Sequence, residues 1–137
     1  MSLWHVAELE LRRIPPAKAR VQDFFLLPDA RSPTVVVLRL NDDPSLRQMH
    51  AVLRGLASSL GLRVERRPFL AHLTLARVLG MASPDLGTRI QMAIPPRVME
   101  RAGEGNLDRV CLYRSDATPA GQHYGVLGSV QLRDGAA

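Results

Sequence analysis

A histidine and a threonine two positions apart are the residues of this sequence best suited to chemistry. They lie in the run Arg67-Pro68-Phe69-Leu70-Ala71-His72-Leu73-Thr74-Leu75-Ala76-Arg77. If this run is a strand, alternate side chains share a face, so His72 and Thr74 project from one side, about 7 Å apart. Imidazole gives or takes a proton near neutral pH, and a neighbouring hydroxyl can hold a non-bridging phosphate oxygen. The pair therefore predicts phosphodiester chemistry, although His-x-Thr alone is a short pattern and a single strand histidine is more often structural.

A third candidate in the same run is Arg77, five residues after the histidine. Regular alternation places Arg77 on the face opposite His72, together with Leu73 and Leu75, which we expect to enter apolar packing. A β-bulge or the end of the strand would return the arginine to the histidine face. Contact with a phosphate and a solvated surface position both stay open for Arg77.

Apolar periodicity predicts the elements that must position these side chains. Strands are expected over residues 17–27, 34–40, 69–78, 108–114 and 124–132, the last two joined by a turn at 118–121, and helices over residues 3–14 and 84–94. A further helix begins at Pro44, with Asp43 as its cap and Gly61 at its end. Strands in pairs with helices between them predict an α+β fold with a largely antiparallel sheet, in one domain over residues 1–137.

The helix from Pro44 carries the clearest apolar stripe of the sequence. Its members alternate in steps of three and four: Leu46, Met49, Leu53, Leu56 and Leu60. Such spacing places them along one face, and we expect that face to be buried against the sheet.

Composition narrows the possible partners. Hydrophobic residues make up 46% and charged residues 23% of the 137 residues, which is typical of a soluble globular protein. A net charge of +5, carried almost wholly by arginines, favours a phosphate-bearing partner, although arginine enrichment is also a mark of a GC-rich genome. One cysteine, Cys111, excludes an intrachain disulfide and a cysteine zinc site. No signal peptide or membrane span is recognisable, which predicts a cytoplasmic protein without a membrane partner.

The run around His72 resembles the second signature of the 2H phosphoesterase superfamily. It is especially similar to the branch of 2′-5′ RNA ligases that also act as RNA 2′,3′-cyclic phosphodiesterases, which show Arg-Pro-Phe-x-Pro-His-x-Thr-Leu-Ala-Arg. The sequence departs from that pattern at Ala71, where proline is usual. The tail from Asp108 to Tyr124 and the order of the preceding elements also resemble the family, so the resemblance covers nearly the whole chain.

The resemblance implies roles for three residues and a class of substrate. His72 would be one of two proton-transfer histidines, Thr74 a phosphate contact and Arg77 a substrate-binding arginine. The family requires neither metal nor cofactor for hydrolysis, and the sequence shows no ligand cluster and no Gly-rich phosphate loop. The implied partners are RNA ends or small cyclic-phosphate nucleotides, and the oligomeric state stays open.

The family uses two His-x-Thr motifs, whereas this sequence contains one. Residues 1–16 align best with the helix that follows the first motif, so we expect a family fold lacking part of its N-terminal lobe. His5 lies in a helical pattern and has alanine where threonine is needed, and neither His50 nor His123 supplies a second motif. Three hypotheses follow: a weak or inactive RNA-end phosphodiesterase or 2′-5′ ligase, a non-catalytic RNA-end-binding module, or a gene start placed too far downstream.

Overall fold

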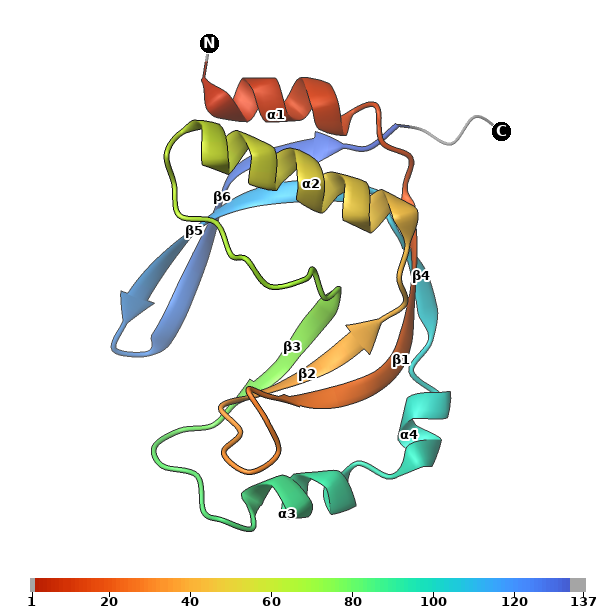
Figure 1. Ribbon diagram of the computed structural model, residues 1–137, viewed down its shortest axis with the longest axis vertical. Coiled ribbons are helices and arrows are strands. Elements are labelled where there is room, and N and C mark those ends of the chain that lie inside the picture. Colours follow the sequence, from red (N-terminus) through yellow and green to blue (C-terminus); the bar gives the residue numbers. More distant parts are fainter. Residues whose placement is uncertain (1, 134–137) are drawn as a thin grey trace. The chain divides into compact units, whose positions relative to one another are not determined.

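The protein is described by a computed structural model over residues 2–133 (Figure 1). Met1 and residues 134–137, the ends of the predicted domain range, lie outside the described residues. The helices are α1 (Leu3–Leu11), α2 (Pro44–Ser59), α3 (Leu86–Ala93) and α4 (Pro96–Glu100). The strands are β1 (Ala17–Leu27), β2 (Val35–Leu40), β3 (His72–Arg77), β4 (Glu104–Leu107), β5 (Arg109–Thr118) and β6 (Gly121–Gln131). The α+β class and the antiparallel strand pairing predicted from the sequence are confirmed.

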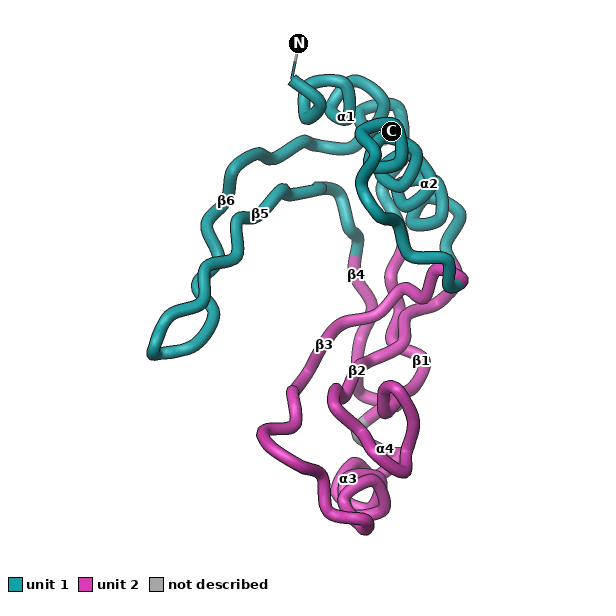
Figure 2. Tube along the Cα trace, turned by 60° about the vertical axis from the view of Figure 1, so that its left-hand side comes forward, with its two compact units in different colours: residues 1–17, 43–67, 106–137 teal, residues 18–42, 68–105 magenta. Residues whose placement is uncertain are grey.

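The described chain divides into two compact units (Figure 2). Among the described residues, unit 1 comprises residues 2–17, 43–67 and 106–133, and unit 2 comprises Lys18–Asp42 and Pro68–Gly105. Each unit is assembled from segments that are distant in the sequence. The organisation as a single domain stays a prediction.

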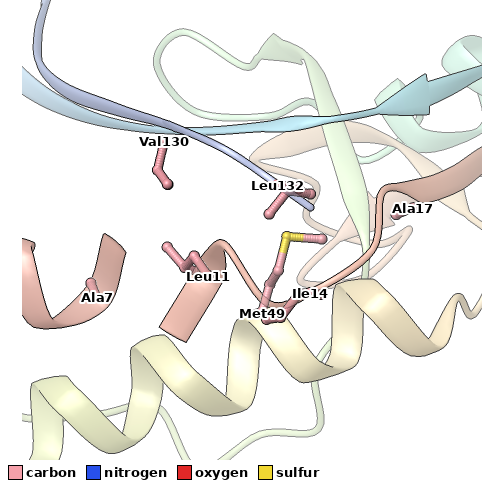
Figure 3. Packing of buried hydrophobic residues seen from close by; sticks show 7 residues of the cluster. All are labelled: Ala7, Leu11, Ile14, Ala17, Met49, Val130 and Leu132. Carbon is pink, nitrogen blue, oxygen red and sulfur yellow. The ribbon is translucent and has the colours of Figure 1, made fainter. Parts of the chain in front are cut away.

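A cluster of buried apolar residues lies in unit 1. Its buried members come from α1, the segment after it, α2 and the end of β6, and Figure 3 shows them as Ala7, Leu11, Ile14, Ala17, Met49, Val130 and Leu132. α1 ends at Leu11, three residues before the predicted end at residue 14. The backbone N–H of Arg133 donates to the carbonyl of Ile14 at 2.9 Å, which ties the chain after β6 to the turn that follows α1. Burial of these apolar side chains supplies the main driving force for folding of the unit.

The ends of α2 follow the sequence prediction, but its buried face is rotated. Asp43 caps the helix by accepting from the Ser45 N–H at 2.8 Å, and Gly61 adopts a φ of 73° just beyond its end. Met49 is buried, and Leu46, Val52 and Leu56 are partly buried against the cluster. Leu53 and Leu60 are exposed, so the predicted stripe is wrong at these two positions. The core takes Val52 in their place, because residues 49, 52 and 56 form an adjacent stripe on the same helix.

This rotation predicts opposite results for two alanine substitutions in α2. Met49→Ala should lower the free energy of unfolding by about 2–5 kcal/mol, because it leaves a cavity in the buried cluster. Leu53→Ala should cost less than about 2 kcal/mol, because the leucine is 37% exposed and little surrounding structure closes over it. Denaturant titrations of the two variants measure this difference. Equal losses would place Leu53 in the core after all.

The β5–β6 hairpin is longer than the sequence predicts. The strands pair antiparallel from Arg109 with Gln131 to Thr118 with Gly121, beyond the predicted end at Arg114. Trp4 of α1 lies against Gly128 of β6, where an added Cβ would lie 2.4 Å from the indole Nε1. Glycine at this position therefore allows the indole to approach the strand closely.

Unit 2 is organised around a four-stranded sheet with the order β3-β2-β1-β4. β2 pairs antiparallel with both β1 and β3. β2 begins with three valines, of which Val36 and Val37 are buried on opposite faces. Asn41 fixes the exit from β2, because its side-chain oxygen accepts from the Arg20 N–H at 2.6 Å and its amide donates to the Lys18 carbonyl at 2.9 Å.

Several predicted boundaries in unit 2 differ from the structure. The strand expected over residues 69–78 is paired in β3 only over His72–Arg77, and the helix expected over residues 84–94 is limited to Leu86–Ala93. α4 and β4 were not predicted. Among residues 2–133, no helix combines the length and the apolarity needed to cross a membrane.

The loop between β1 and β2 is ordered by a carboxylate and packs against α3. Asp29 accepts from the backbone N–H groups of Ser32 at 3.0 Å and Arg31 at 2.8 Å. These hydrogen bonds, with that of Ser32 the largest cause, hold the pKa of Asp29 below its ordinary value. The neighbouring carbonyl of Ala30 lies so close to Gly87 of α3 that an added Cβ would be 2.0 Å from it.

Asp29 should make stability depend on pH in the acid range. Its folded-state pKa is lowered, so its contribution is present above the unfolded pKa and disappears as the pH falls through the folded value. Asp29→Ala should therefore destabilise the chain at neutral pH and lose most of that effect at an acidic pH below the lowered folded-state pKa. Denaturant titrations at the two pH values measure the change. An effect of equal size at both would mean that the ionised form is not required.

Candidate functional site

β3 presents the predicted site residues on its surface. His72 and Thr74 are both exposed, and their partners on β2 are Arg39 and Val37. Arg39 and Val37 are two positions apart on one strand, and directly paired residues of an antiparallel sheet share a face. His72 and Thr74 therefore project from the same face, as the sequence predicts.

A bulge in β3 determines the side of Arg77. Thr74 pairs with Val37, but the next pair is Ala76 with Val36, so Leu75 has no partner of its own. The extra residue shifts the alternation by one position, and Arg77 then pairs with Val35 on the face shared by Val37 and Arg39. The bulge thus selects one of the two placements left open by the sequence, and His72, Thr74 and Arg77 share one face.

The two leucines of β3 do not enter apolar packing as predicted. Leu73 is 50% exposed and Leu75 is 53% exposed, and all six residues of the strand are accessible. β3 ends the strand order on one side, so among residues 2–133 it pairs with β2 alone. An edge strand is covered by fewer neighbouring side chains, which accounts for the exposure.

A hydrogen bond orients the imidazole of His72. Its Nδ1 lies 2.7 Å from the carbonyl oxygen of Leu70. A carbonyl can only accept, so Nδ1 carries the proton and donates it. In the neutral ring the lone pair then belongs to Nε2. Nε2 is therefore the atom that can take a proton from a reacting group.

A charged pair extends the same face across the sheet. Arg39, opposite His72, donates from Nε to Oδ1 of Asp23 at 2.7 Å and also from Nη2 to Oδ2. Its guanidinium carbon lies 4.5 Å from the centroid of the Phe25 ring. Asp23, Phe25 and Leu27 of β1 pair with Arg39, Val37 and Val35 of β2, so they lie on the His72 face as well. Asp23 and Arg39 were not predicted as site residues, although a charge inside each of two apolar strands was an available signal.

The two arginines on this face differ in whether a carboxylate balances their charge. Arg39 is balanced by the carboxylate of Asp23. Within residues 2–133, no hydrogen bond or ion pair engages the side chain of Arg77. An arginine without a carboxylate partner keeps its fork of donors available for a phosphate. The face thus presents a hydroxyl at Thr74, a guanidinium at Arg77 and an imidazole at His72.

The other histidines occupy different settings. His5 lies in α1, where its Nδ1 is 3.5 Å from the Glu8 carboxylate. His123 pairs with Asp116 near the tip of the hairpin and is exposed, and His50 is partly buried in α2. Among the described residues, no group of three or more His, Cys, Asp or Glu side chains is arranged to hold a metal ion.

Comparisons with known proteins give a fold and no activity. No protein-family model and no curated protein matches the sequence. The crystal structure of TT0787 of Thermus thermophilus is similar, with a TM-score of 0.70 and 22% identity, over 95% of this chain and 68% of that one. A likeness at this identity shows the fold alone.

Proposed function

We propose that this chain acts on RNA ends as a 2H-type phosphoesterase that opens 2′,3′-cyclic phosphates. The observation that carries the proposal is the bulge at Leu75, which places Arg77 on the same exposed face of β3 as His72 and Thr74. Without the bulge, the strand would present only two of the three residues to a phosphate. The resemblance of residues 67–77 to the second signature of the superfamily supplies the substrate class.

The orientation of His72 favours a role as general base. Nε2 would take a proton from a water molecule that attacks phosphorus, while Thr74 and Arg77 hold the non-bridging oxygens. The bond from phosphorus to one ribose oxygen breaks, and that oxygen takes up a proton from solvent water to become a hydroxyl. The product is a ribose with a phosphate monoester. Attack by a ribose hydroxyl in place of water would join two RNA ends by the same chemistry.

A non-catalytic RNA-end-binding module is the alternative. The observation in its favour is that the sequence contains one His-x-Thr motif, while His5, the early candidate for a second, is a helix residue beside Glu8. A face with one proton-transfer group can bind a phosphate and still lack a partner that protonates the leaving oxygen.

Incubation with a nucleoside 2′,3′-cyclic monophosphate separates the two functions. The enzyme would convert it to a non-cyclic nucleotide, which chromatography resolves, whereas the binding module would retain RNA with a cyclic end and leave it unchanged. Because the family chemistry uses no metal, a chelator should not reduce turnover. Turnover that requires an added divalent cation would contradict the proposed mechanism.

A further inference from the structure

A pocket in unit 1 is lined almost entirely by arginines. Its volume is about 520 Å³, and its lining consists of Arg54 of α2 together with Arg63, Val64 and Arg66 of the segment after that helix. The volume falls within the range of about 300–1,000 Å³ that is typical of small-molecule sites. It is large enough for a nucleotide unit rather than for a bare phosphate alone.

The charge of this pocket is not balanced within the described structure. Over residues 2–133, no hydrogen bond or ion pair engages the side chains of Arg54, Arg63 and Arg66. The carboxylate of Glu65 lies 3.7 Å from Arg67, which does not line the pocket. Three like charges around one concavity repel one another, and a bound anion would relieve that repulsion.

We propose that this pocket binds the phosphodiester backbone of a single RNA strand. Each guanidinium presents a planar fork that matches two phosphate oxygens, and Val64 offers an apolar wall for a sugar or base. A polymer of phosphates satisfies three separated cations better than a single ion does, and the net charge of +5 attracts such a polymer at long range. The choice of RNA rather than DNA rests on the proposed function.

The test measures binding of a single-stranded RNA of about 12 nucleotides, a length within the range that single-strand-binding domains cover. The variant is R54A/R63A/R66A, and its matched control is R12A/R97A/R133A. The control removes the same charge from three exposed arginines outside the pocket. Fluorescence anisotropy at several salt concentrations gives the affinity and its salt dependence.

We expect the pocket variant to lose three phosphate contacts. Each contact on a single strand contributes about 0.7 to the slope of log affinity against log salt, so the slope should become shallower by about 2. Between about 50 and 200 mM salt, wild-type affinity should then fall about 15- to 20-fold more than that of the variant. The control should keep a slope closer to that of the wild type. Equal changes of slope in both variants would contradict RNA binding at the pocket. They would show that affinity depends on the total charge of the protein and not on these three arginines.

A second arm uses inorganic phosphate, measured by calorimetry. If the pocket variant loses phosphate binding but keeps RNA affinity, the site takes a free ion and the RNA proposal is wrong.

Circular dichroism of both variants shows whether they fold. R54K/R63K/R66K supplies a variant that keeps the positive charge but lacks the planar guanidinium groups. Because binding is measured without turnover, an inactive chain that still shows arginine-dependent RNA binding contradicts only the proposed function. An active chain without such binding contradicts only this inference.

Discussion

Replacing His72 with alanine should reduce hydrolysis of a 2′,3′-cyclic phosphate by about 10²–10⁴-fold, the usual contribution of one general acid or base. The substitution removes Nε2, the nitrogen left free by the hydrogen bond from Nδ1 to Leu70. It should change stability little, because His72 is exposed on an edge strand. Steady-state rates with a cyclic mononucleotide measure the effect, and a fall in kcat with little change in KM would place it on the chemical step.

The matched control is His5→Ala, which removes an exposed histidine from α1. We expect it to retain the wild-type rate. His50→Ala and His123→Ala address the second proton-transfer group in the same assay. A loss in either variant as large as that of His72→Ala would identify the partner histidine. Unchanged turnover in His72→Ala would remove the proposed site.

The elements that the sequence predicts best are those with local signals at both ends. β1 has the predicted bounds, because Pro15-Pro16 precedes it and the Pro28-Asp29 turn follows it. α2 begins and ends as predicted, because a cap, a first-turn proline and a C-terminal glycine act within a few residues of each boundary. Chemistry confined to neighbouring residues can be inferred from the sequence alone.

The features that were missed depend on partners distant in the sequence. β4 contains Gly105 and Asn106, which have low strand propensity, and its place beside β1 is set by tertiary pairing. The polar end of β5 is a strand because β6 supplies its hydrogen-bond partners. Periodicity also could not select the buried stripe of α2, because both candidate stripes share Met49 and Leu56.

In the candidate site, too, some features depend on neighbouring residues and others on residues distant in the sequence. The common face of His72 and Thr74 follows from the two-residue period of a strand, which is a property of the strand itself. The side of Arg77 depends on which residue of β3 is left unpaired by β2, and residues 67–77 do not contain that information. The register between β2 and β3 can therefore change which face a binding residue such as Arg77 occupies, even where that residue matches the motif.

Leu11→Ala should be the most destabilising of the single substitutions considered, with a loss of about 2–5 kcal/mol in the free energy of unfolding. Leu11 is 0% exposed and belongs to the cluster that includes Ile14, Met49 and Val130 (Figure 3). Removing its terminal carbons forfeits their burial and leaves a cavity, because neighbours on α1, α2 and β6 can close only part of the space. Trp4, the single tryptophan of the sequence, packs against the same cluster, so its fluorescence follows the unfolding of unit 1.

The matched control is Leu9→Ala, in the same helix, where the leucine is 48% exposed. Both substitutions exchange leucine for alanine in the same helix, so the difference between their losses reports mainly on burial and the cavity. We expect the control to lose less than about 1 kcal/mol, and similar losses would contradict the assignment of Leu11 to the core. Far-ultraviolet circular dichroism in the same titration reports both units. Coincidence of its transition with that of Trp4 fluorescence would support the prediction of a single domain, whereas separate transitions would show that the two units unfold independently.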